Sequence, residues 1–276
     1  MGSKIESNAA TAFVNDGFVF PMRAISGAEA ADAVREIESI EARNPNMDQR
    51  TRDHEVLRFK SHLRFPFLDC IAHSTAVLDA VEALIGPDIL IWSSSVFIKE
   101  PGDGTYFGWH QDSCTYELEG DELITAWIAL SPATVDNGAM RFLPGSHRRG
   151  PLQHEDTWDP KNLGSRGERL AVAVDDENAV DVALSPGEAS LHHLHLMHES
   201  RPNRSARRRI GYAVRYMSPA MRHRSGKASV TPARGRADAQ AWTLEPRPTG
   251  ENEAAVLDAY RRSIEERVGE TLREKA

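Results

Sequence analysis

The chain has 276 residues, is 40% hydrophobic and carries a formal net charge of −8, so it is long enough for one sizeable β-rich core with added helices. Its acidic balance argues against nucleic acid or an anionic membrane as partner, because both attract proteins with a positive field. With two cysteines and no apolar run near the ~20 residues that span a bilayer, a disulfide scaffold, a CxxC zinc site and a membrane protein are excluded, and we expect a cytoplasmic protein.

The N-terminal part is predicted to be a helical layer over residues 10–88, after a disordered leader. Residues 13–25 are typical of a short strand, and Ser26 is placed to cap an amphipathic helix over residues 27–44. A second helix is expected over residues 74–86, with Ser74 as its cap and Gly86 as its end.

From Ile89 the pattern changes to short apolar runs separated by Gly, Pro and Asn. Eight such runs predict a sandwich or barrel rather than alternating βαβ units, and we expect a jelly-roll core over residues 89–218. The runs cover residues 89–100, 106–112, 123–134, 139–147, 170–174, 180–187, 189–200 and 209–218. The polar residues 148–169 are a candidate lid, residues 250–276 are expected to form a C-terminal helix, and residues 1–276 are predicted to be a single domain.

The motif His110-Gln111-Asp112 places two metal-ligand side chains two residues apart, which on a strand puts both on one side. A further imidazole would complete a facial 2-His-1-carboxylate triad, which leaves open positions on Fe(II) for a bidentate co-substrate and dioxygen. Alone, such a tripeptide is weak, because a surface His beside a solvated Asp is common. Its position between a Gly-rich turn and the apolar run ITAWIAL favours the mouth of a strand, where sites tend to lie.

Four histidines follow on one run: His192, His193, His195 and His198. Counting does not choose among them, since a strand alternates its faces. We favour His198, because Ser200 lies two residues on and Arg209 eleven residues on. A guanidinium is suited to a carboxylate such as the distal one of 2-oxoglutarate, and a hydroxyl can add a hydrogen bond. The alternative is that Arg209 is one solvated cation in an Arg-rich run.

The segment from Trp109 to Tyr216 resembles the phytanoyl-CoA dioxygenase family in WHQD, TAWIALSPATVDNGAMRFLPGSH and HLMHESRPNRSARRRIGYAVRY. The resemblance implies a double-stranded β-helix, with His110, Asp112 and His198 as iron ligands and Arg209 as the 2-oxoglutarate arginine. It also implies that Ser200 and Trp127 line the co-substrate pocket. Halogenating relatives replace the carboxylate ligand by Gly or Ala, and this chain keeps Asp112, so hydroxylation or a related oxidation is expected.

The expected function is hydroxylation of a C–H bond of a small polar metabolite by Fe(II), 2-oxoglutarate and O2, with release of succinate and CO2. An amino acid, an aminophosphonate or a natural-product intermediate is favoured, and the alternative within the family is an acyl-CoA or carrier-thioester hydroxylase. Two further alternatives are a non-enzymatic jelly-roll binding protein and a cupin-like enzyme that uses zinc or manganese without a keto acid. The protein is expected to be a monomer or homodimer.

An anionic or zwitterionic substrate is expected, because cations could gather near the site. The candidates are Arg50, Arg52, Arg58, Lys60, Arg64, Arg148 and Arg149. The alternative for each of them is a solvated side chain.

Overall fold

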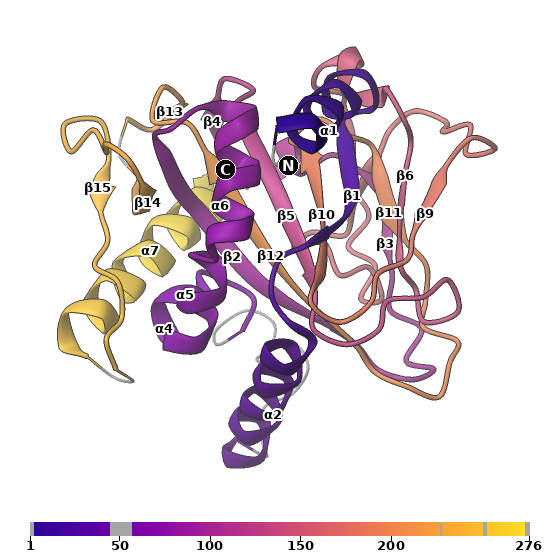
Figure 1. The fold of residues 1–276 in the computed structure, drawn as a ribbon, viewed down its shortest axis with the longest axis horizontal. Coiled ribbons are helices and arrows are strands. Elements are labelled where there is room, and N and C mark those ends of the chain that lie inside the picture. Colours follow the sequence, from indigo (N-terminus) through magenta and orange to yellow (C-terminus); the bar gives the residue numbers. More distant parts are fainter. Residues whose placement is uncertain (1–2, 45–56, 227, 251–252, 274–276) are drawn as a thin grey trace.

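The computed structural model describes residues 3–44, 57–226, 228–250 and 253–273, and its framework is two β-sheets that face each other (Figure 1). The larger sheet consists, in spatial order, of β1 (Phe18–Arg23), β10 (Glu188–His193), β5 (Leu123–Ala129), β12 (Arg209–Met217), β2 (Ile89–Lys99), β14 (Ser229–Arg234) and β15 (Thr243–Leu244). The smaller sheet consists of β3 (Phe107–His110), β11 (His198–Ser200), β6 (Met140–Phe142) and β9 (Val180–Val182). Strand pairing is antiparallel except between β14 and β15. Two further short antiparallel pairs join β4 (Leu118–Glu119) to β13 (Arg222–His223) and β7 (His154–Asp156) to β8 (Glu168–Leu170).

Helices cover the outer face of the larger sheet (Figure 1). They are α1 (Ser3–Asp16), α2 (Gly27–Arg43), α4 (Ser61–Arg64), α5 (Pro66–Ala72), α6 (Thr75–Ile85) and α7 (Ala254–Arg273). Two 3-10 turns, η2 (Asp112–Thr115) and η3 (Ser146–Arg149), lie in the connections. Within the described residues, no helix combines the length and the apolar character that crossing a membrane requires.

The alternation of β12 shows how the sheet separates two cores. Ile210, Tyr212, Val214 and Tyr216 pack with the helical layer, whereas Ala213 belongs to the cluster between the sheets. Because successive side chains of a strand point to opposite faces, Arg209, Gly211 and Arg215 share the inner face with Ala213. The inner face of β12 therefore carries two arginines into the space between the sheets.

Several local predictions are confirmed. Ser26 and Glu29 form a reciprocal capping box at the start of α2. Gly86, at φ 90°, ends α6 as predicted. The predicted side-chain cap of this helix is wrong, because Ser74, the residue before α6, donates its hydroxyl to the carbonyl of Ala24 instead. The jelly-roll fold class is also confirmed, because two opposed antiparallel sheets form the core.

Other local predictions are wrong. The expected disordered leader contains α1, which buries Phe13 against the core. The expected strand over residues 170–174 ends at Leu170. The sheet also extends beyond the predicted range of 89–218, because β1, β14 and β15 belong to it.

The candidate lid is a structured segment, not a bare loop. It holds η3 and the β7–β8 pair, and it lies against the strand before the HxD motif, since Leu163 donates to the carbonyl of Tyr106 over 2.8 Å. Its movement over the site stays a prediction.

Candidate metal centre and co-substrate pocket

His110, Asp112 and His198 come together between the sheets, with one ligand atom of each within 4.8 Å of the others. His110 ends β3 and pairs in register with His198 on β11, while Asp112 begins the 3-10 turn that follows β3. The His198 Nε2 lies 3.8 Å from Asp112 Oδ1, and the two imidazole centroids are 4.1 Å apart. The structure thus assembles the three residues that the sequence suggested as a facial triad.

Both imidazoles are held in the orientation that a metal ligand needs. The Nδ1 of His110 lies 2.8 Å from the carbonyl of Gly108, and the Nδ1 of His198 lies 3.0 Å from that of Leu196. A carbonyl only accepts, so each Nδ1 carries a proton, and in the neutral ring the lone pair is on Nε2. Burial, reinforced by the neighbouring histidines, holds the pKa of His198 well below its usual range, which leaves the ring neutral and able to bind a metal.

The Asp112 carboxylate is buried and oriented by two neighbours. Thr125 donates to its Oδ2 over 2.6 Å, and the Nε2 of His192 lies 3.5 Å from the same oxygen. Burial alone would raise the pKa of Asp112, but His192, His198 and Arg215 outweigh it and hold the pKa well below its usual value. The carboxylate is therefore ionised and acceptor-only, as a divalent metal requires.

The remaining histidines of this run divide between two places. His192 faces the metal centre, since its ring centroid lies 4.8 Å from that of His198. His193 packs instead against Phe13 of α1 and against His147, with centroid distances of 6.1 Å and 5.2 Å. His147 thus lies at α1 rather than in the pocket. This separation follows strand alternation, which sequence counting could not assign to a face.

Gln111, between the two ligands of the motif, ties them to the candidate lid. Its side chain donates to the carbonyls of Gly150 and His195 over 2.9 and 2.7 Å and accepts from Leu152 over 2.8 Å. Its backbone N–H donates to the Nε2 of His154 on β7 over 3.0 Å. The lid segment therefore begins at a fixed anchor beside the metal ligands.

Arg209 lies in the interior, and the alternative of a solvated cation is wrong. Its side chain is 1% exposed, and it stacks at 5.1 Å over the ring of Trp127, with one guanidinium N–H donated to the carbonyl of Gly138. Its Nε has no hydrogen-bond partner among the described residues, and no carboxylate there forms an ion pair with it. Burial lowers the Arg209 pKa to about 10, so the group stays charged at neutral pH.

Lys99, at the end of β2, is a pocket residue that sequence reasoning missed. Its Nζ donates to the Ser200 hydroxyl over 2.7 Å and to the Ser200 carbonyl over 2.9 Å, and the side chain is fully buried. Burial and the charge of Arg209 lower its pKa to about 5. Strand alternation from Phe97 could have placed Lys99 on the inner face, but a Lys at the end of a strand is usually solvated.

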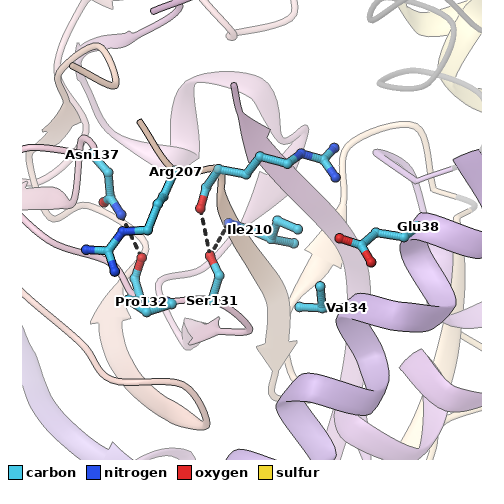
Figure 2. Close-up of a pocket in the computed structure, with 8 residues that line it drawn as sticks. Val34, Glu38, Ser131, Pro132, Asn137, Arg207 and Ile210 are labelled. Carbon is cyan, nitrogen blue, oxygen red and sulfur yellow. Dashed lines mark hydrogen bonds between the residues drawn. The ribbon is translucent and has the colours of Figure 1, made fainter. Parts of the chain in front are cut away.

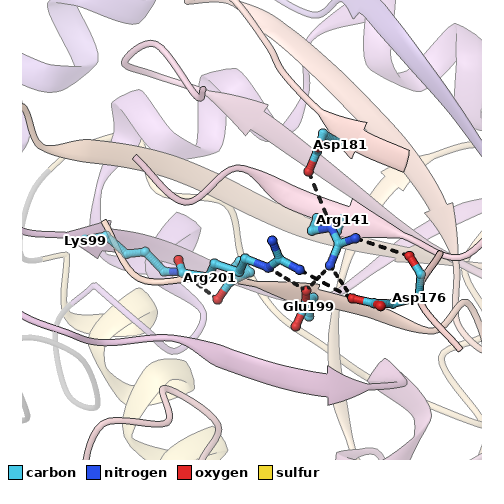
Figure 3. A network of polar contacts seen from close by, with 7 residues as sticks. Lys99, Arg141, Asp176, Asp181, Glu199 and Arg201 are labelled. Atoms are coloured by element: carbon cyan, nitrogen blue, oxygen red, sulfur yellow. Dashed lines mark hydrogen bonds and ion pairs between the residues drawn. The ribbon is translucent and has the colours of Figure 1, made fainter. Parts of the chain in front are cut away.

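An ion-pair network fastens the outer side of the smaller sheet (Figure 3). Arg141 on β6 contacts Glu199 on β11 and Asp176, each over 2.7 Å, and Asp181 on β9 at 3.5 Å. Arg201 contacts Asp176 at 3.3 Å and Glu199 at 3.4 Å. Since Glu199 stands between His198 and Ser200, this network fixes the strand that carries a metal ligand and a pocket hydroxyl.

The predicted substrate cations have different roles. Lys60 forms a buried ion pair with Glu245 at 2.5 Å, and Arg64 stacks on Tyr260 at 5.1 Å. Arg148 donates to the carbonyl of Asn15, and Arg149 contacts the sulfur of Met197. Arg50 and Arg52 lie outside the described residues. Arg58, 4.5 Å above the Phe97 ring, is the one of the described candidates beside the inner face of β2.

A hollow of about 310 Å³ lies on the helical side, and Figure 2 shows residues that line it. It is lined by Val34, Glu38, Ser131, Pro132, Asn137, Arg207, Arg208 and Ile210. None of these is a triad residue, and Arg208 is paired with Glu41 and Glu100 at 2.8 Å. The hollow is separate from the metal centre.

A jelly roll with two imidazoles and one carboxylate at its mouth defines a class, the non-haem iron oxygenases with a facial triad. The comparisons agree with this class. The model of the family described as phytanoyl-CoA dioxygenase (PhyH) matches residues 13–211, and the chain belongs to this family.

Relatives and solved structures give the same result. A solved structure of the non-haem monooxygenase ThoJ is 34% identical, with a TM-score of 0.85 over 96% of this chain and 99% of that one. A probable alpha-ketoglutarate-dependent hypophosphite dioxygenase of Stutzerimonas stutzeri is 31% identical, over 55% of each protein. Ectoine dioxygenase of Sphingopyxis alaskensis is 25% identical over 72% of this chain and 71% of its own length. The chain spans about half the length of the first curated relatives that it matches.

The predicted family is thereby confirmed, and His110, Asp112 and His198 form a donor set that fits Fe(II). By their names, these relatives act on small molecules.

Proposed function

We propose that the protein hydroxylates a C–H bond of a small polar metabolite, with 2-oxoglutarate converted to succinate and CO2. The observation that carries this proposal is the assembly of His110, Asp112 and His198 within 4.8 Å, with both Nε2 lone pairs left available by backbone-anchored Nδ1 atoms. A bound Fe(II) would supply the activation of dioxygen that a side chain cannot perform.

The protein's own residues would bind and orient the co-substrate. Arg209, buried and without a carboxylate partner among the described residues, would take the distal carboxylate of 2-oxoglutarate. The Ser200 hydroxyl, which accepts from Lys99, would donate to the same group, and Trp127 would hold the guanidinium plane. A buried cation without an anion is costly, which supports a pocket built for a dianionic ligand.

The substrate is proposed as an amino acid, an aminophosphonate or a natural-product intermediate, anionic or zwitterionic. Names such as methylphosphonate hydroxylase and ectoine dioxygenase among the relatives support small polar substrates. A hydroxylase of acyl-CoA or carrier thioesters is the alternative within the family.

The test is anaerobic loading with Fe(II) and 2-oxoglutarate, followed by air and quantification of succinate with a panel of amino acids, aminophosphonates and acyl thioesters. We expect substrate-stimulated succinate that is lost in His110→Ala and Asp112→Ala. Full activity in either variant would contradict the ligand assignment. Absence of the visible band of an Fe(II)–keto-acid chelate in the wild type would favour a jelly-roll binding protein.

A further inference from the structure

A row of side chains crosses the inner face of the larger sheet at the level of the metal centre. His192 on β10 is in register with Thr125 on β5, and Thr125 is in register with Arg215 on β12. His192 and Thr125 both contact Asp112. Arg215 is the next residue of this row and lies six positions along β12 from Arg209, on the same face.

Arg215 is a buried cation that the protein leaves incompletely paired. It is 8% exposed, and its Nη1 donates to the Ser95 hydroxyl over 2.8 Å. Its buried Nε has no hydrogen-bond partner among the described residues, and no carboxylate there forms an ion pair with it. A guanidinium in this state has donors available for a ligand.

The wall beside Arg215 is aromatic, and the Arg58 guanidinium lies over it, 4.5 Å from the Phe97 ring and 5.9 Å from the Phe107 ring. The Arg215 guanidinium lies 5.7 Å from the Phe97 ring, which meets the Phe107 ring edge-on at 5.3 Å. Phe107 in turn stacks on the metal ligand His110 at 5.5 Å. Both phenylalanines keep intermediate exposure although β2 is an inner strand of the sheet. Two partly exposed rings therefore link Arg215 to the metal ligand His110.

The charges of the loaded site also leave Arg215 without a counter-charge. If Fe(II) and 2-oxoglutarate were bound, Asp112 and one carboxylate of 2-oxoglutarate would balance the metal, and the other carboxylate would balance Arg209. The positive charge of the buried Arg215 would then remain, and near a buried group an anion interacts more strongly than in water.

We propose that Arg215 binds an oxyanion of the substrate, a carboxylate or a phosphonate, against the Phe97–Phe107 wall, and so selects which C–H bond lies beside the metal. This inference rests on the proposed function and narrows its substrate class to molecules that carry an oxyanion. It makes Arg215 a specificity residue distinct from the co-substrate residues.

The test is binding to the protein loaded anaerobically with Fe(II) and 2-oxoglutarate, so that Arg209 is occupied. The probes are benzoate and phenylphosphonate, with neutral benzamide as the matched ligand, titrated by calorimetry. Wild type should bind at least one anion about tenfold more tightly than benzamide. In Arg215→Gln that anion should bind about tenfold more weakly, whereas Arg236→Gln, a surface control that is 92% exposed, should match wild type.

Tighter binding of benzoate would identify a carboxylate site, and tighter binding of phenylphosphonate would identify a phosphonate site. Equal anion binding in wild type and Arg215→Gln, or no anion preference in wild type, would overturn the inference. If Arg215→Gln does not form the Fe(II)–keto-acid band, Arg215→Lys replaces it in the same titrations. Lysine keeps the positive charge but lacks the paired N–H donors of the guanidinium. A wild type that never forms the band contradicts the proposed function, while Arg215-dependent anion binding in it would still support the oxyanion site.

Discussion

Gly211 leaves the space that the Trp127 ring fills, since a Cβ at Gly211 would lie 1.9 Å from Trp127 Cζ2. The two residues are on neighbouring strands, β12 and β5, and Trp127 supports the guanidinium of Arg209 at 5.1 Å. The backbone of Gly211 is not in the left-handed region, so its conformation does not require glycine. Glycine is needed because the Trp127 ring lies where a side chain would be. The position of Arg209, the proposed co-substrate arginine, thus depends on the absence of a side chain at Gly211, two residues along β12.

Gly211→Ala should weaken 2-oxoglutarate binding. The ring must move, and overpacking of this kind costs about 1–3 kcal/mol. We expect the dissociation constant of 2-oxoglutarate to rise about tenfold, measured by anaerobic titration of the Fe(II)–keto-acid band. Gly27→Ala, where the nearest atom to the new Cβ is 3.9 Å away, should leave the constant unchanged. An unchanged constant in Gly211→Ala would show that Trp127 does not position Arg209.

Glu199→Gln should weaken iron binding without removing a ligand. The change breaks the ion pairs of β11 with Arg141 and Arg201, while the carboxamide keeps its size. We expect about a threefold to tenfold loss of Fe(II) affinity, at or below the range for groups bonded directly to a metal ligand. Competition with a chelator measures it, and Asp32→Asn in the exposed pair with Arg35 is the control. A lower melting temperature with unchanged affinity would make the network purely structural.

The metal motif could be predicted because its information is local. The spacing of His110 and Asp112 needs only the geometry of one strand end, but the choice of His198 depends on register with His110 across the smaller sheet. Four nearby histidines offered that choice. Only packing shows that His193 turns toward α1 and His192 toward Asp112.

Long-range pairing explains most of what the sequence did not predict. A lysine such as Lys60 is usually expected at the surface. Its partner Glu245 lies on a segment whose sequence shows no strand pattern. Strand β14 was missed because its sequence, SVTPAR, is short, polar and interrupted by Pro232. Lys99 and Arg215 become candidate binding residues only when alternation and burial place them between the sheets.

Glu245→Ala should destabilise the fold strongly. Both its oxygens are used in the interior, by Lys60 at 2.5 Å and by Thr231 at 2.8 Å, and the variant leaves the Lys60 charge buried without its partner. Breaking such a pair costs about 3–5 kcal/mol. The double variant Lys60→Met/Glu245→Leu should lose less than the single one in urea unfolding. A double variant as unstable as the sum of the two single variants would show that the pair is not coupled.

His62 should make stability fall at acid pH. It is fully buried, with its two ring nitrogens 2.7 Å from the Ser94 hydroxyl and 2.8 Å from the Thr231 hydroxyl. Burial lowers its pKa from 6.5 to about 4. Between these values the unfolded chain binds a proton at His62 that the folded chain excludes, so the free energy of unfolding decreases as the pH falls through this window.

From pH 7.5 to pH 5 this difference amounts to about 2 kcal/mol, because each pKa unit corresponds to about 1.4 kcal/mol. Wild type should therefore lose about 2 kcal/mol more than His62→Gln over that range in urea unfolding at fixed ionic strength. The glutamine can still reach both hydroxyls but does not titrate, so the gap in stability between the two proteins should narrow toward acid. A gap that stays constant would mean that His62 is protonated in the folded protein or that its neutral form is not what the interior requires.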